Sequence, residues 1–152
     1  QIRSLGVKLK HNINKSLIKN KSLILIDDSL VRGTTSVKII KMLYESGAKE
    51  VHLRIASPPI KYPDYYGVDT PSKKELLASK YDLEGMRKFI NASSLEFLSI
   101  EGLYKSMGFS KRNDVYPQFT DHCFTGDYPV NPIDANSKDI EKNKISFLSS
   151  KN

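Results

Sequence analysis

Two adjacent carboxylates, Asp27 and Asp28, follow an apolar run and precede a short polar loop that ends in Gly33, Thr34 and Thr35. Carboxylates only accept hydrogen bonds, so they suit the hydroxyl donors of a sugar, or a Mg²⁺ ion that also holds phosphate oxygens. Glycine lets the backbone approach a ligand closely, and the threonine hydroxyls lie beside the amide donors of a helix start, which suit a phosphate. The two acids can bind the hydroxyls of a sugar, and the donors a few residues later can bind its phosphate. This combination indicates a ribose 5-phosphate site.

The acidic loop lies between a predicted strand and a predicted helix. An unbroken apolar run within residues 22–26 is typical of a strand covered on both faces in a parallel sheet. Apolar residues then recur at helical spacing over 37–44, a hydroxyl residue among 34–36 can cap the helix start, and Gly47 is placed to end it. A second strand at 51–56 completes a unit with a right-handed crossover. Ligands of such sheets bind beyond the carboxyl ends of the strands, where the acids lie.

An ordinary surface turn is the alternative for the same residues. Aspartate and serine are common in turns and helix caps, and for the Asp27-Asp28 pair alone this interpretation is preferred. The complete string from Asp27 to Thr35 favours the phosphate site instead, because two acids that repel each other are costly near a phosphate unless they bind something. Arg32 fits either a phosphate contact or a simple cover for the loop.

The rest of the chain is predicted to hold short helices and one more strand. Prolines and a glycine keep residues 57–72 irregular, and the later elements are expected as helices at 73–79, 82–90 and 100–107 and a strand at 95–98. The chain after Lys111 is aromatic and irregular, and its lysine-, asparagine- and serine-rich end, from Asp134, predicts a loosely held tail.

The predicted fold class is therefore α/β, a parallel sheet with flanking helices and an irregular C-terminal tail. We divide it into a lead-in at 1–20, the sheet and helices at 21–110, and an extension at 111–152. The chain opens at Gln1 inside a basic stretch, which is typical of a cut through a larger protein.

Composition limits the function classes. The chain has 152 residues, of which 39% are hydrophobic and 27% charged, as in ordinary globular proteins. Its net charge of +7 comes mostly from scattered lysine, which favours a solvated surface over a nucleic-acid partner. The single cysteine, Cys123, excludes an internal disulfide. Because no apolar run approaches the roughly 18 residues of a membrane span and no signal-peptide pattern opens the chain, we expect a soluble, cytoplasmic protein without a membrane partner.

The loop resembles the signature of type I phosphoribosyltransferases, which is an apolar strand, two acids and a phosphate loop ending in Gly-Thr-Thr. Residues 25–35, Leu-Ile-Asp-Asp-Ser-Leu-Val-Arg-Gly-Thr-Thr, are most similar to the glutamine amidophosphoribosyltransferase family. Upstream, residues 6–10 resemble the end of the family's flexible loop. Downstream, the similarity continues in order through the blocks at 46–51, 57–60, 66–71, 75–76 and 124–129. The match spans about residues 6 to 130 and resembles the C-terminal part of the family's transferase domain.

The resemblance implies a partial type I phosphoribosyltransferase fold. It also implies the phosphoribosyl diphosphate-binding part of an enzyme that makes 5-phosphoribosylamine from that substrate and glutamine-derived ammonia in purine synthesis. Asp27 and Asp28 would hold the ribose hydroxyls and Mg²⁺. The implied substrate-binding residues are Asp27, Asp28, Ser29, Val31, Arg32, Gly33, Thr34, Thr35 and Lys10. Ammonia would displace pyrophosphate at the ribose C1, helped by positioning and by Mg²⁺, and no residue is assigned as general base. Purine nucleotides would be inhibitors, and the parent protein would be a homo-oligomer.

The sequence departs from the family in three respects. The family's glutaminase domain, which precedes the transferase domain, uses an N-terminal cysteine nucleophile, so we expect no glutaminase activity from a chain whose only thiol is Cys123. The first half of the transferase domain is also missing, so we expect the isolated chain to be inactive and to leave apolar sheet surface bare. Some members bind an iron–sulfur cluster through cysteines, but Asp64 and Thr120 stand at two matching places, and a single thiolate excludes a cluster. His122 beside Cys123 suggests a metal, yet two ligands without a third make a weak site.

Two other function classes stay open. A different type I phosphoribosyltransferase, such as one using a nucleobase, would share the loop, although the blocks after Pro58 favour the amidotransferase. A non-catalytic sensor of a phosphoribosyl ligand would also use the loop. A regulator of that kind would need a DNA-binding module, and the sequence shows neither a helix-turn-helix pattern nor a concentrated basic stripe.

Overall fold

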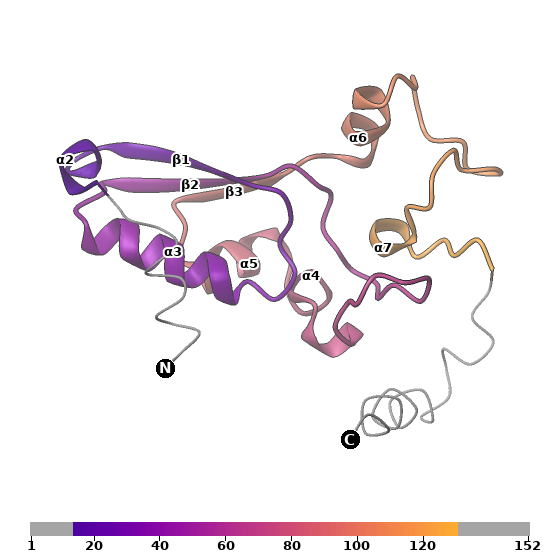
Figure 1. The fold of residues 1–152 in the computed structure, drawn as a ribbon, viewed down its shortest axis with the longest axis horizontal. Coiled ribbons are helices and arrows are strands. Elements are labelled where there is room, and N and C mark those ends of the chain that lie inside the picture. Colours follow the sequence, from indigo (N-terminus) through magenta and orange to yellow (C-terminus); the bar gives the residue numbers. More distant parts are fainter. Residues whose placement is uncertain (1–13, 131–152) are drawn as a thin grey trace.

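The computed structural model describes residues 14–130. A three-stranded parallel sheet in the order β1-β2-β3 forms its centre (Figure 1). The strands are β1 (Ser22–Asp27), β2 (Glu50–Ile55) and β3 (Ser94–Phe97), and the two longest helices are α3 (Thr34–Glu45) and α5 (Leu83–Ile90). The short elements are α2 (Lys15–Ile18), η1 (Lys73–Glu75), α4 (Leu77–Lys80), α6 (Ile100–Ser106) and α7 (His122–Thr125). The α/β prediction is confirmed.

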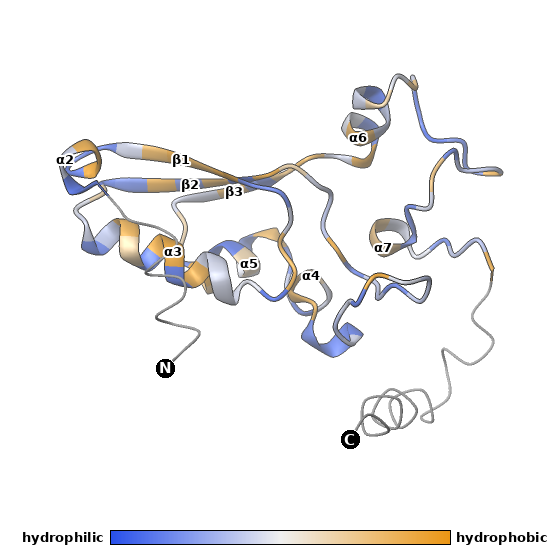
Figure 2. Ribbon diagram, in the orientation of Figure 1, coloured by the Kyte–Doolittle hydropathy of each residue, from blue (hydrophilic) through white to orange (hydrophobic). Residues whose placement is uncertain are grey.

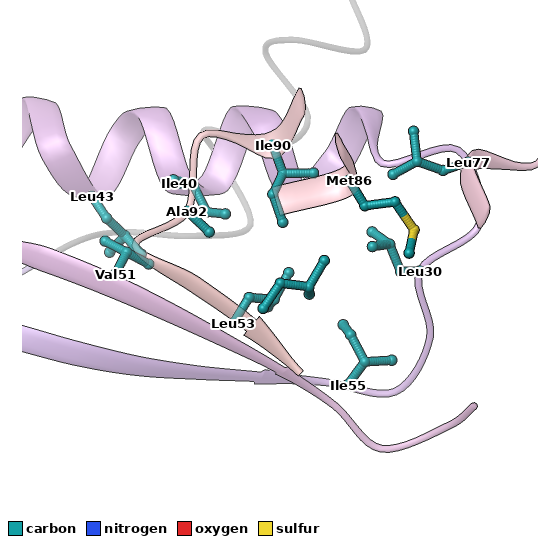
Figure 3. Close-up of a cluster of buried hydrophobic side chains, with 11 residues drawn as sticks. Leu30, Ile40, Leu43, Val51, Leu53, Ile55, Leu77, Met86, Ile90 and Ala92 are labelled. Atoms are coloured by element: carbon teal, nitrogen blue, oxygen red, sulfur yellow. The ribbon is translucent and has the colours of Figure 1, made fainter. Parts of the chain in front are cut away.

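The register of the strands sets which residues form the core. Leu25 of β1 pairs with Leu53 of β2, and Leu53 pairs with Leu95 of β3. Both α3 and α5 lie on the same face of the sheet (Figure 1). One cluster of buried side chains lies between these helices and the sheet (Figure 3): Leu30, Ile40, Leu43, Val51, Leu53, Ile55, Leu77, Met86, Ile90, Ala92 and Leu95. Leu30, in the loop after β1, and Leu77, the first residue of α4, belong to this cluster, so the core also fixes that loop and the start of that helix.

The C-terminal end of α3 was predicted correctly, whereas the cap at its N-terminal end was predicted wrongly. Ser46 and Gly47 end the helix as expected, because Gly47 adopts a φ of 92° that glycine tolerates. None of the hydroxyl residues 34–36 caps the start. Gly33 is the N-cap residue instead, with a φ of 75° and no side-chain hydrogen bond. The helix start is therefore left without a side-chain cap.

The prediction of a first strand covered on both faces is wrong for the described chain. β1 is an edge strand whose side chains alternate between half-buried and exposed, and Ile24 and Ile26 are 69% and 73% exposed. Figure 2 shows apolar residues along this strand. The helices α3 and α5 cover one face of the sheet, and Ile24 and Ile26 are exposed on the other face. The expected bare apolar surface is thus confirmed. An apolar run alone does not reveal whether a second layer is present.

Beyond β3, the chain forms a smaller unit around α6 and α7. Tyr104 of α6 is fully buried and donates to Asp121 Oδ2 at 2.8 Å. Arg112 Nε donates to the same oxygen at 2.6 Å, and Arg112 Nη2 donates to Asp127 at 2.5 Å. Burial alone would raise the pKa of Asp121, but the Arg112 guanidinium and the tyrosine hydroxyl outweigh burial and lower it. Polar pairing therefore orders a segment that was predicted to be irregular, and α7 was not predicted.

Within residues 14–130, no helix is long and apolar enough to cross a membrane. The predicted tail from Asp134 and most of the lead-in lie outside the described residues, so those predictions stay open. The cytoplasmic location also stays a prediction.

Candidate functional site

A cavity of about 330 Å³ opens where β1 ends, and it is lined by ten consecutive residues, 27 to 36. The end of the strand is fixed because the Asp27 carbonyl accepts a hydrogen bond from the Ala56 amide at 2.9 Å. Eight of the nine substrate-binding residues predicted from the sequence line this cavity: Asp27, Asp28, Ser29, Val31, Arg32, Gly33, Thr34 and Thr35. The ninth, Lys10, lies outside the described residues. The structure brings the eight together, while their ligands stay predictions.

The two carboxylates each use one oxygen inside the loop. Asp27 Oδ1 accepts from the Asp28 amide at 3.0 Å, and Asp28 Oδ1 accepts from the Ser29 hydroxyl at 2.9 Å. These bonds orient the carboxylates at the strand end. The second oxygen of each has no hydrogen-bond donor among residues 14–130, so two acceptor oxygens are available to hydroxyl donors or to a divalent cation.

The start of α3 supplies hydrogen-bond donors to the same cavity. The first N–H groups of a helix have no acceptor inside the helix, and here the first intrahelical bond runs from the Val37 amide to the Gly33 carbonyl. No side chain caps this end, and residues 34–36 line the cavity. Because α3 has twelve residues, its dipole adds partial positive charge at the cavity. The cavity therefore joins carboxylate acceptors to an anion-binding helix start.

The segment from η1 to α5 packs against the loop at residues 28–33, a contact that local sequence patterns do not predict. The Leu77 amide donates to the Val31 carbonyl at 2.8 Å. A Cβ added to Gly33 would lie 2.9 Å from Leu77 Cδ2 and 3.1 Å from Phe89 Cε1, so the loop packs directly on both side chains. We call Leu77 and Phe89 the packing pair. A contact between residues so far apart leaves no local sequence signal.

Arg32 is held by an acid rather than standing free in the cavity. Its Nε and Nη2 atoms both lie 3.1 Å from Glu75 Oε1. The other oxygen of Glu75 accepts from the Ser72 amide at 3.2 Å and the Ser72 hydroxyl at 3.0 Å, as in a capping box. The Ser72 hydroxyl and the Arg32 guanidinium lower the pKa of Glu75. The capping box could have been found from Ser72 and Glu75, three residues apart, but its contact with Arg32 could not.

A second polar cluster lies outside this cavity. His122 Nε2 is 2.8 Å from Asp64 Oδ2, and the Cys123 thiol lies 3.8 Å from the same oxygen. Asp64 is the third group that was missing when the histidine and cysteine were considered from sequence. Burial and the Asp64 carboxylate raise the pKa of the Cys123 thiol to about 11. The pKa of Asp64 is lowered although burial opposes this, because the Tyr66 and Val68 amides and His122 stabilise the charge.

Comparison with known proteins agrees with the geometry. No family model matches the chain. The amidophosphoribosyltransferase of Rhizobium etli is 56% identical over 99% of this chain, and that of Bacillus subtilis is 45% identical over 85%. A solved glutamine phosphoribosylpyrophosphate amidotransferase from B. subtilis, complexed with ADP and GMP, superposes with a TM-score of 0.69 at 46% identity, over 78% of this chain and 26% of that chain.

The parallel sheet with flanking helices, together with the likeness to this solved amidotransferase, identifies part of a type I phosphoribosyltransferase fold. The chain spans 30% of the R. etli relative and 27% of the B. subtilis relative. Over that part, the chain belongs to the amidophosphoribosyltransferase family.

Proposed function

We propose that this chain forms the phosphoribosyl diphosphate-binding part of an amidophosphoribosyltransferase. The observation that carries the proposal is that one cavity is lined both by the acid pair, Asp27 and Asp28, and by the start of α3, which no side chain caps among residues 14–130. A ligand that fits both needs a hydroxylated sugar joined to a phosphate. The family relationship supports a phosphoribosyl compound as that ligand. It also favours an amidophosphoribosyltransferase over the nucleobase enzyme or the sensor left open by the sequence.

The 5-phosphate of the ligand is proposed to lie at the helix start. The amides of residues 34–36 and the hydroxyls of Thr34 and Thr35 would donate to its oxygens. Each contact between a charge and the helix dipole contributes about 0.3–1 kcal/mol, and up to about 2 kcal/mol in a partly buried geometry. Gly33 has no side chain that would block this approach. Ser29, Val31 and Arg32 would complete the wall around the phosphate.

Asp27 and Asp28 are proposed to accept hydrogen bonds from the two ribose hydroxyls. Their unpaired oxygens also fit Mg²⁺, which is typically held by one or two carboxylates together with substrate phosphates. When bound, that ion would neutralise charge on the leaving pyrophosphate. The acids thus orient the ribose, so that C1 faces the incoming nucleophile.

The proposed reaction breaks the bond from C1 to the pyrophosphate oxygen and forms a bond from C1 to the ammonia nitrogen. Pyrophosphate leaves with the bonding electron pair, and the extra proton on nitrogen passes to solvent or pyrophosphate. This chain contributes positioning, which keeps the reacting atoms close and aligned. Ammonia would come from a glutaminase outside this chain, as part of a homo-oligomeric parent enzyme.

Nucleotide inhibition is proposed to involve the same cavity. The B. subtilis structure is complexed with ADP and GMP. A purine nucleoside monophosphate shares the ribose 5-phosphate group with the proposed substrate, so it would compete for the helix start and the acids. Inhibition at this site would therefore be competitive with phosphoribosyl diphosphate.

Calorimetric titration tests the proposal. Phosphoribosyl diphosphate with Mg²⁺ is titrated into the chain and into an Asp27→Asn/Asp28→Asn variant. An Asp69→Asn/Glu45→Gln variant is the matched control, because it removes the same charge at two exposed residues outside the cavity. We expect the chain and the control to bind, the acid-pair variant to lose at least about tenfold in affinity, and GMP to compete.

Two outcomes would refute the proposal. One is an absence of binding by a chain whose circular dichroism shows it to be folded. The other is equal affinity for the acid-pair variant and the parent chain, since the carboxylates would then have no part in recognition.

A further inference from the structure

Asp64, His122 and Cys123 bring three different kinds of metal-binding side chain together, and none of them lines the phosphate cavity. Their candidate ligand atoms all lie within 4.8 Å of one another. Asp64 and His122 are 7% and 2% exposed, and Cys123 is half-buried. One carboxylate oxygen, one imidazole nitrogen and one sulfur are donor types with which proteins bind Zn²⁺.

We propose that these three residues bind one divalent ion of the zinc type, which links the loop around Asp64 to α7. Zinc bonds of about 2.0–2.3 Å at tetrahedral angles place neighbouring ligand atoms about 3.3–3.7 Å apart. The distances from Asp64 Oδ2 are 2.8 Å to His122 Nε2 and 3.8 Å to Cys123 Sγ. Opening the first distance by about half an ångström would therefore admit the ion, with water as the fourth ligand.

The backbone around the cluster holds the proposed ligands in place. Asp64 Oδ1 accepts from the Tyr66 amide at 2.6 Å and the Val68 amide at 3.1 Å, which leaves Oδ2 directed at the other two groups. The Cys123 carbonyl accepts from the Lys61 amide at 2.9 Å, so α7 is tied to the same loop beside the thiol. Support of this kind from outer groups orients ligands in metal sites.

A hydrogen-bond network alone does not satisfy the histidine. Nδ1 of His122 is buried and is one of two such side-chain atoms without a hydrogen-bond partner among the described residues. With Nε2 on the ion, Nδ1 would carry the ring proton, and a bound water is expected to accept from it, because buried polar atoms without partners are uncommon. On binding, the Cys123 thiol would release its proton to water, and the imidazole would bind as its neutral form.

Cobalt is the probe for this site, because Co²⁺ takes the geometry of Zn²⁺ and absorbs visible light. Cys123 is the only cysteine in the sequence, so a thiolate-to-cobalt charge-transfer band has a single source. We expect one equivalent of Co²⁺ to give this band together with tetrahedral d–d bands, and one equivalent of Zn²⁺ to abolish both. Asp64→Asn should weaken Co²⁺ binding at least tenfold, whereas His52→Gln, on the sheet, should leave it unchanged.

The titration of the unaltered chain decides the proposal even if a variant fails to fold. Stoichiometric Co²⁺ that produces no thiolate band would overturn it, and the cluster would then be a hydrogen-bonded packing element. An unchanged band and affinity in Asp64→Asn would also overturn it, because the carboxylate would not be a ligand. As a second readout, Zn²⁺ is expected to raise the unfolding temperature of the unaltered chain but not that of Cys123→Ser.

Discussion

Replacing Gly33 by alanine tests whether the phosphate loop is held by packing from outside. Gly33 has a φ of 75°, and its missing Cβ would lie 2.9 Å from Leu77 Cδ2 and 3.1 Å from Phe89 Cε1. Alanine therefore meets two separate penalties: the left-handed backbone and the contact with the packing pair. Leu77 is 2% exposed and belongs to the core, so it has little room to move away.

The two penalties can be estimated separately. A left-handed backbone costs a residue with a Cβ about 1–2 kcal/mol. Overpacking a well-packed site by a methyl group costs about a further 1–3 kcal/mol. Gly33→Ala should therefore lower the free energy of unfolding by about 2–5 kcal/mol. Gly108 has a φ of 87° and no heavy atom within 4 Å of an added Cβ, so Gly108→Ala should cost only the first amount.

Urea unfolding followed by circular dichroism measures both variants. A Gly33→Ala/Leu77→Ala double variant tests the contact itself, because it removes Leu77 Cδ2. The double variant should lose less unfolding free energy than the two single variants lose together. Titration with phosphoribosyl diphosphate should also show weaker binding by Gly33→Ala than by Gly108→Ala. If the two glycine variants lose equal stability and the double variant is additive, the loop is not held by the packing pair and the reasoning fails.

Three further changes test other parts of the structure. Glu75→Gln keeps the capping box but removes the charge opposite Arg32. Because both side chains of this pair are half exposed, urea unfolding should show only a small loss of stability at low salt and a smaller one at high salt. Arg112→Met should cost about 3–5 kcal/mol at neutral pH, because it leaves the buried Asp121 charge unpaired. The pKa of Asp121 is lower in the folded chain than in the unfolded chain. Its contribution to stability is therefore present above the unfolded pKa and is lost as the pH falls through the folded pKa. Urea titrations at several pH values should show this loss in the parent chain and not in Arg112→Met. Finally, Ile24→Thr/Ile26→Thr should change stability by less than about 1 kcal/mol while reducing self-association in sedimentation, because both side chains lie mostly in solvent.

The strand, loop and helix that form the phosphate cavity could be predicted from sequence because their signals are local. An apolar run of the right length gave β1, helical spacing gave α3, and Gly47 marked the helix end. The acid pair then had to lie at the carboxyl end of the strand, where ligands of such sheets bind. The cap of α3 was predicted wrongly, because Gly33 takes the position that a hydroxyl side chain was expected to fill.

Features that depend on distant contacts could not be predicted in this way. The apolar run of β1 fits equally an edge strand with one open face and a central strand, and only the number of neighbouring layers decides between them. Asp64 was noted from the sequence only as a place where some family members have a cluster cysteine. Its contact with His122 could not be predicted, because the two residues are 58 positions apart. Local patterns show which side chains are available, whereas the fold decides which of them meet.

The structure also separates what this chain can do alone from what it needs the rest of the enzyme to do. The proposed phosphate-binding groups at the start of α3 and the packing pair that supports them all come from residues 27 to 89. Asp27 and Asp28, the proposed ribose ligands, lie at the end of an edge strand whose outer face is exposed at Ile24 and Ile26 in the described chain. Displacement at C1 needs water to be excluded, because water would otherwise compete with ammonia. The proposed phosphate binding would therefore use groups that this chain supplies, whereas the proposed transfer reaction would need further residues to exclude water, and the relatives have room for these in the rest of their length.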